Sequence, residues 1–155
     1  MKSKEFSVIF LLLTVLTAAG CGKSGRAAKN PADIIDLLGE YSGRKEIVTL
    51  YTDETIDEFR KFINLSGVEP ENSYSILSFV PDKSEVEVTG ETCDGNICTL
   101  TIRFLQHPVE NMKGFSFDII VRQEGDNWKI DRSKDFQKMS MEMEKNGAGV
   151  YLKNL

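Results

Sequence analysis

Histidine, cysteine and basic residues are scarce in this 155-residue chain, and their scarcity limits the chemistry that it can support. His107 is the single histidine and there are three cysteines, so a zinc site of cysteine and histidine ligands lacks partners. Lys and Arg number 19 against 24 Asp and Glu, which gives a formal net charge of −5. A net acidic chain is a poor binder of nucleic acid. We therefore expect no metal, no cofactor and no nucleic-acid partner.

Long apolar runs are absent apart from residues 6–19. This run is shorter than the roughly 20 residues that cross a bilayer core. Lys2 and Lys4 precede it and small residues follow it, which is the layout of a secretory signal peptide. We expect residues 1–20 to be such a peptide.

Cys21 follows Ala18-Ala19-Gly20, and this stretch resembles the lipobox of bacterial lipoproteins, although that family usually has leucine in the place of Ala18. The resemblance implies that Cys21 is acylated, carries palmitate and anchors the chain to a bacterial membrane. In that family Gly22 is compatible with sorting to the outer membrane, with the domain facing the periplasm. Ordinary cleavage near Gly20 and an uncleaved anchor are alternatives. The polar, locally basic residues 21–30 are expected to form a tether.

Gly22-Lys23-Ser24 also looks like the end of a phosphate-binding loop. That loop requires a first glycine at position 17, where Thr17 stands, and an amphipathic helix afterwards. Residues 25–31 offer no apolar helical face, so we do not expect a nucleotide site here.

Cys93 and Cys98 flank Asp94-Gly95-Asn96-Ile97, whose Asp-Gly pair is a turn signal between strands. In an oxidising periplasm we expect them to form a disulfide, and their spacing argues against a redox-active pair. The apolar faces of residues 84–92 and 97–106 match only when paired numbers have an even sum, whereas the two cysteines give an odd sum. A β-bulge, expected at Gly90, reconciles the two registers.

The remaining pattern predicts one α+β domain at residues 31–155. We expect N-terminal helices packed on a curved antiparallel sheet of about four strands, followed by a C-terminal helix. The expected helices are 31–38, stopped by Gly39, then 44–65, and one that begins at Ser133 or Asp135 and ends at Gly147. The middle region is either two helices with a new start at Thr52 or Asp53, or one kinked helix. The expected strands are 84–92, 97–106, 114–123 and 127–132, while 74–80 is ambiguous.

Two apolar stripes are expected to face the core. Phe115, Phe117, Ile119 and Val121 share a face of the third strand, and Phe136, Met139 and Met143 form a stripe on the last helix. The methionine stripe fits gap-filling core better than a binding surface.

The order of helices before a meander, with the hairpin Glu-Gly-Asp-Asn-Trp-Lys-Ile-Asp at 124–131, resembles small bacterial lipoproteins with a cystatin-like fold, related to the nuclear transport factor two-like superfamily. The resemblance covers about residues 43–132. It implies that Trp128 packs against the sheet and that a cone-shaped pocket lies between helices and sheet. In some relatives this pocket houses isomerase or dehydratase chemistry.

Proton transfer in such a pocket requires a carboxylate or histidine beside an oxyanion donor. Asp118 is the catalytic candidate, with Tyr41, Tyr51 and His107 as possible helpers, but no pair has a fixed catalytic spacing. Asp118 alternates with apolar neighbours, so a solvated residue on the outer face is the simpler interpretation. We therefore predict a lipid-anchored binding or assembly module for an envelope protein or a small apolar ligand. A periplasmic pocket enzyme of the isomerase or dehydratase type is the alternative.

Overall fold

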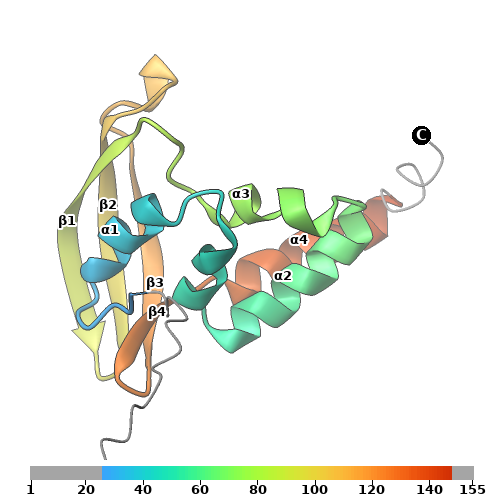
Figure 1. Cartoon of the computed structure of the whole chain (residues 1–155), viewed down its shortest axis with the longest axis horizontal. Helices are drawn as coiled ribbons and strands as arrows, with labels where there is room; N and C mark the ends of the chain where they lie inside the picture. The colour runs from blue at the N-terminus through green and yellow to red at the C-terminus, as the bar shows by residue number, and fades with distance from the viewer. Residues whose placement is uncertain (1–25, 148–155) are drawn as a thin grey trace, which may run out of the picture.

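The computed structural model describes residues 26–147, which form an α+β fold built on one four-stranded sheet (Figure 1). The strands lie in the order β1-β2-β3-β4, and each neighbouring pair is antiparallel. The expected fold class is confirmed. The strands are β1 (Glu85–Asp94), β2 (Ile97–Gln106), β3 (Ser116–Glu124) and β4 (Asn127–Asp131). The α-helices are α1 (Asp33–Glu40), α2 (Asp53–Ser66), α3 (Tyr74–Leu77) and α4 (Ser133–Asn146), and the 3-10 helices are η1 (Lys45–Leu50), η2 (Pro70–Asn72) and η3 (Glu110–Met112).

Two-residue turns connect β1 to β2 and β3 to β4. Each turn begins with a glycine, Gly95 or Gly125, whose φ is +60°. A glycine with positive φ at this position is typical of type II′ hairpins, whose twist matches that of the flanking strands. Both turns therefore form where the sequence indicated them.

The register between β1 and β2 changes at Thr89. Val88 pairs with Ile102, but Gly90 pairs with Thr101, so Thr89 is the extra residue of a β-bulge. The bulge converts the even-sum pairing of the apolar faces into the odd-sum pairing of the hairpin cysteines, one residue before the expected position Gly90.

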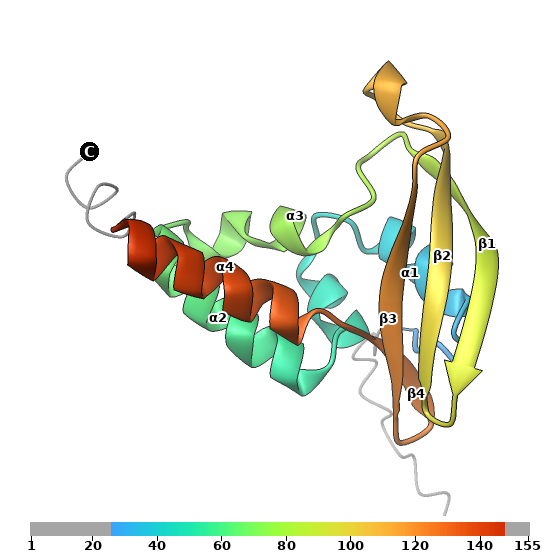
Figure 2. The same cartoon turned by 180° about the vertical axis from the view of Figure 1, so that it is seen from behind.

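α1 and η1 cover one face of the sheet. No helix of residues 26–147 covers the other face, which is turned to the viewer in Figure 2. The strands contribute fully buried side chains to the covered face, and the helices meet them with aliphatic ones. These core residues are Ile34, Leu38, Leu50, Leu100, Ile102, Val121 and Ile130. Burial of each such side chain contributes about 1.5–3 kcal/mol. Side chains of the helices and the strands thus form a packed core on this face of the sheet.

α1 ends at Glu40, two residues later than expected, so Gly39 does not end the helix. Tyr41 follows the helix, is only 4% exposed, and its hydroxyl accepts a hydrogen bond from the Arg26 backbone N at 2.5 Å. Gly39 lowers helix stability by about 1 kcal/mol relative to alanine. Burial of Tyr41 at the end of α1 offsets that loss.

α2 and α4 pack on each other and project from the sheet as a two-helix arm (Figures 1 and 2). Phe59 and Phe62 of α2 contact Phe136 of α4, with ring centroids 5.1 and 5.8 Å apart. The apolar face of α2 is covered by α4, and not by the sheet as its place among the N-terminal helices predicts. α4 begins immediately after Arg132, one residue past β4, and therefore leaves the sheet edge instead of turning back across it.

Thr52 separates η1 from α2. Its side chain accepts a hydrogen bond from the Thr55 backbone N at 3.2 Å, which is the bond of a helix N-cap. Two helical elements are therefore present, and the interpretation as one kinked helix is wrong. On α4, Met139 and Met143 are partly buried against the core, as expected of gap-filling residues.

Candidate functional site

β4 covers only part of the edge of β3. It pairs with residues 120–124 and ends at Asp131, which lies opposite Ile120. Within the described chain, residues 116–119 of β3 therefore have β2 on one side and no strand on the other. We call residues 116–119 the open edge.

Backbone groups of the open edge point away from the sheet. The Phe104 N donates a hydrogen bond to the Phe115 O at 3.0 Å, so residue 115 faces β2. Because bonding direction alternates along an antiparallel strand, the N–H and C=O groups of Ser116 and Asp118 face the open side. No bond between these groups and another segment is found in residues 26–147.

The other edges of the sheet are covered or blunted. The Trp128 N donates to the Ala28 O at 2.9 Å, and the Thr52 N donates to the Ile130 O at 3.0 Å, so the N-terminal chain covers β4. β1 carries the bulge and several carboxylates, two features that discourage strand pairing. These acidic residues are Glu85, Glu87, Glu91 and Asp94.

A groove of about 490 Å³ lies beside the open edge. Phe79 and Phe117 pack edge to face within it, with ring centroids 5.6 Å apart. The Arg132 guanidinium lies 5.8 Å from the centre of the Phe79 ring. Lys134 and Asp135 of α4 also line the groove, as do Asp118, Ile120 and Arg122 of β3. We call this space the edge groove, and its volume is within the range of ligand pockets, about 300–1,000 Å³.

An exposed aromatic side chain also lies outside the edge groove, next to the open edge. Phe115 is 50% exposed and Phe117 is partly buried, although both were expected to face the core. The expectation for Phe115 is therefore wrong, because the helices do not cover this end of β3. The exposed rings provide apolar surface at the open edge.

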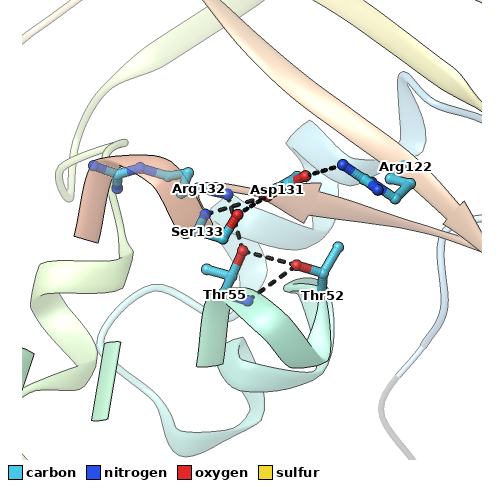
Figure 3. Close-up of polar contacts among 6 residues, drawn as sticks. All are labelled: Thr52, Thr55, Arg122, Asp131, Arg132 and Ser133. Carbon is cyan, nitrogen blue, oxygen red and sulfur yellow. Dashed lines mark hydrogen bonds and ion pairs between the residues drawn. The ribbon is translucent and has the colours of Figure 1, made fainter. Parts of the chain in front are cut away.

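Asp131 is the last residue of β4 and lies two residues before the start of α4 (Figure 3). Its Oδ1 accepts hydrogen bonds from the Ser133 N at 3.2 Å and the Ser133 Oγ at 2.8 Å, and its Oδ2 accepts one from Arg122 Nη2 at 2.6 Å. Burial acts to raise the pKa of Asp131, but the Ser133 hydrogen bonds and the Arg122 charge outweigh it and hold that pKa below its ordinary value. Asp131 is thus an anion that joins β3, β4 and α4.

α2 starts from the same polar cluster (Figure 3). The Thr55 Oγ1 accepts a hydrogen bond from the Arg132 N at 2.9 Å and lies 2.8 Å from the Thr52 Oγ1. Both threonines are at most 2% exposed, so an unpaired hydroxyl here would cost about 1–3 kcal/mol. The two helices of the arm therefore begin at one buried polar junction, which fixes where β4 must stop.

Tyr51 lies in the core beside this junction. Its hydroxyl donates a hydrogen bond to the Leu77 O. Burial raises the pKa of Tyr51 far above its ordinary value, although Arg132 acts to lower it. Tyr51 is therefore a neutral structural donor, which fits the packing interpretation.

Asp118 lies on the exposed side of the sheet, where its Oδ1 accepts a hydrogen bond from the Thr101 Oγ1 at 2.7 Å. The structure does not bring it together with Tyr41 or Tyr51, which are buried in the core on the helix side. His107 lies in the β2–β3 connection, where its Nδ1 accepts a hydrogen bond from the Val109 N at 2.9 Å. Asp118 lines the edge groove, which has no tyrosine among its lining residues.

Cys93 and Cys98 lie directly opposite each other on β1 and β2, and their sulfur atoms are 2.03 Å apart, the distance of a disulfide bond. The Glu91 carboxylate lies within 4.8 Å of both sulfurs. A metal would need thiolates, and the bonded sulfurs do not provide them.

Sequence reasoning did not single out Phe79, Arg132 or Asp131. The expected strand 127–132 was already shorter than its neighbour 114–123, and this difference implied an open edge. The Asp-x-Ser spacing of residues 131–133, at a boundary between strand and helix, is the signal that could have identified the junction.

No protein-family model, curated protein sequence or solved structure matches this chain. The expected signal peptide, residues 1–20, and the lipidation site Cys21 lie outside the described residues. Within residues 26–147, the helices are too short or too polar to cross a membrane.

The substitution Asp131→Asn tests the junction. We expect it to lower the free energy of unfolding by about 2 kcal/mol at neutral pH, because hydrogen bonds to a charged group are lost. The folded-state pKa is lowered from an unfolded value near 3.9, so the contribution of Asp131 is present above about pH 4 and is lost as the pH falls through the folded-state pKa. Urea unfolding is measured from about pH 7 to pH 3. The difference in free energy of unfolding between the wild type and Asp131→Asn should become smaller as the pH falls.

Asp135→Asn is the matched control. Asp135 pairs with Arg132 at 3.1 Å, but its side chain is 61% exposed, so the expected change is within about 0.5 kcal/mol. If Asp131→Asn lowers the free energy of unfolding no more than Asp135→Asn does, the stabilising role of Asp131 is wrong. It is also wrong if the loss of free energy does not change with pH.

Proposed function

We propose that this chain is a lipid-anchored lipoprotein of the bacterial cell envelope whose domain binds an extended segment of a partner protein. The segment adds to the sheet as a strand along the open edge. The observation that carries this proposal is the outward direction of the Ser116 and Asp118 backbone groups, beside a groove with an aromatic wall.

An extended peptide has the backbone that matches this edge. Outward N–H and C=O groups recur at every second residue, and a strand about 4.8 Å away can bond to each of them. β4 already bonds to β3 in this way at residues 120–124. The partner segment would continue the line of β4 past Asp131, which is the mode called strand addition.

Phe79 and Phe117 define the side-chain preference of the site. Side chains of an added strand alternate between the two faces of the sheet, so every second one meets these rings in the edge groove. We therefore expect an apolar side chain at that position of the partner. Backbone bonds supply the affinity, and this apolar contact supplies the selectivity.

The lipid anchor is the second part of the proposal. The apolar run 6–19, the small residues before Cys21 and the short polar stretch after it support acylation of Cys21. Ala28 is already bonded to Trp128, so the folded domain begins soon after the tether starts. By the lipobox resemblance, the domain would face the periplasm from the outer membrane. The order of the elements is compatible with the cystatin-like lipoproteins.

Asp118→Pro tests strand addition, because proline removes the outward N–H and leaves the bonds to β2 in place. A photo-crosslinking residue at Lys134, on the edge groove, is expected to give a partner adduct in whole cells. The adduct should be lost in Asp118→Pro and retained in Asp118→Ala, which removes the same carboxylate but keeps the donor.

A crosslinker at Lys138, one turn further along α4, is the positional control and should give no such adduct. Circular dichroism must show that both Asp118 variants are folded. An adduct with the same yield in Asp118→Pro would overturn strand addition at this edge.

Replacement of Cys21 with Ser tests the anchor. The wild-type chain should incorporate labelled palmitate and sediment with membranes, and Cys21→Ser should lose both properties. The double replacement Cys93→Ser/Cys98→Ser, which leaves Cys21 intact, should retain the label. A wild-type protein that is unlabelled and soluble would refute the anchor.

A further inference from the structure

One end of the sheet carries both hairpin turns and the start of the described chain (Figure 1). Trp128 pairs with Gln123, and the Gln123 N donates to the Asn96 O at 2.8 Å, so Trp128 is level with the β1–β2 turn. Ala28 bridges to Trp128 at this same level. We call this end of the molecule the tether end.

The length of the tether restricts how the domain sits on a membrane. Ala28 follows Cys21 by seven residues, which span at most about 25 Å when fully extended. The distance along β3 from Gln123 to Ser116 is about 24 Å, and the β2–β3 connection lies beyond Ser116. If the β2–β3 connection faced the membrane instead, the tether would have to be fully extended along the sheet, which is entropically costly. Given the proposed anchor at Cys21, on which this step rests, the tether end faces the lipid.

A second groove, of about 550 Å³, extends from the tether end to α2 of the arm. Val48, Ile56 and Trp128 give it a partly exposed apolar lining. Tryptophan combines a large apolar ring with a polar N–H, and it is enriched where proteins meet membrane interfaces. We call this space the tether-end groove.

The charged side chains that line the tether-end groove are mostly basic, in a chain whose formal net charge is −5. The side chains of Arg26 and Arg60 are 78% and 71% exposed, and within residues 26–147 they form ion pairs with exposed carboxylates alone. Such surface pairs contribute about 0–1 kcal/mol, so a phosphate can replace the carboxylate. Lys129 is less available, because it lies 2.9 Å from Glu124 and is 21% exposed. The lining residues that carry charge are Arg26, Asp53, Arg60 and Lys129.

We propose that the phospholipid headgroup layer of the membrane that holds the anchor occupies the tether-end groove. The lipid phosphates pair with Arg26 and Arg60, and Trp128 lies at the level of the headgroups. This orientation directs the open edge of β3, at the opposite end of the sheet, toward the compartment and its partner.

Trp128 is the only tryptophan of the chain, and its fluorescence tests this orientation directly. The lipidated protein is reconstituted in vesicles of phosphatidylethanolamine and phosphatidylglycerol that contain a headgroup-nitroxide lipid. We expect quenching of Trp128 emission. In Arg60→Glu the quenching should fall, whereas Lys138→Glu, the same kind of charge change outside the groove on α4, should leave it unchanged.

A second probe position controls for general proximity to the vesicle. In Trp128→Phe/Met141→Trp the tryptophan is on the arm, where Met141 is 58% exposed, and it should be quenched less than Trp128. A lipidated protein whose Trp128 is unquenched, or in which the arm probe is quenched more, would overturn the orientation. Unchanged quenching in Arg60→Glu would overturn the phosphate contact. Palmitate labelling is measured on the same samples, so failure of the anchor is distinguished from failure of this inference.

Discussion

The ionised carboxylate of Asp131 is the interaction on which the rest of the structure depends. It accepts hydrogen bonds from Arg122 and Ser133, and its side chain is only 10% exposed. The Arg122 Nε has no hydrogen-bond partner within residues 26–147, so the bond to Asp131 is what holds that guanidinium. Asp131 therefore ends β4, ties it to β3 and accepts a hydrogen bond from Ser133, the first residue of α4. Thr55 adds α2 to the same point through the Arg132 backbone.

This junction explains why the sheet has an open edge. Because the chain leaves the sheet at Asp131, β3 continues beyond its partner, and the arm of α2 and α4 points away from the sheet. The N-terminal chain covers the edge of β4, while acidic residues and a bulge blunt β1. The open edge of β3 then lies toward one end of the sheet, and the tether-end groove reaches Trp128 near the other end. We propose that one end faces lipid and the other end faces a protein partner.

Local patterns predicted most of the elements, because their signals are short-range. The period of two predicted the strands, Thr52 predicted the start of α2, and the parity conflict at the cysteines predicted the bulge near Gly90. The contact between α2 and α4 could not be predicted from local patterns. An apolar helix face predicts that the face is buried, but it does not identify the element that packs against it. The bond between Thr55 and Arg132 joins residues 77 apart in the sequence, which no local pattern encodes. Asp118 was chosen because a resemblance suggested a pocket, although the strand pattern already placed it on the outer face.

Backbone amide hydrogen exchange along residues 116–119, measured by NMR on the soluble Cys21→Ser protein, tests the open edge most directly. The amides of Ser116 and Asp118 have no acceptor within residues 26–147, whereas Phe117 and Ile119 face β2. We expect fast exchange at 116 and 118 and slow exchange at 117 and 119. Slow exchange at all four positions in the free protein would contradict this expectation, because the edge would then already be paired.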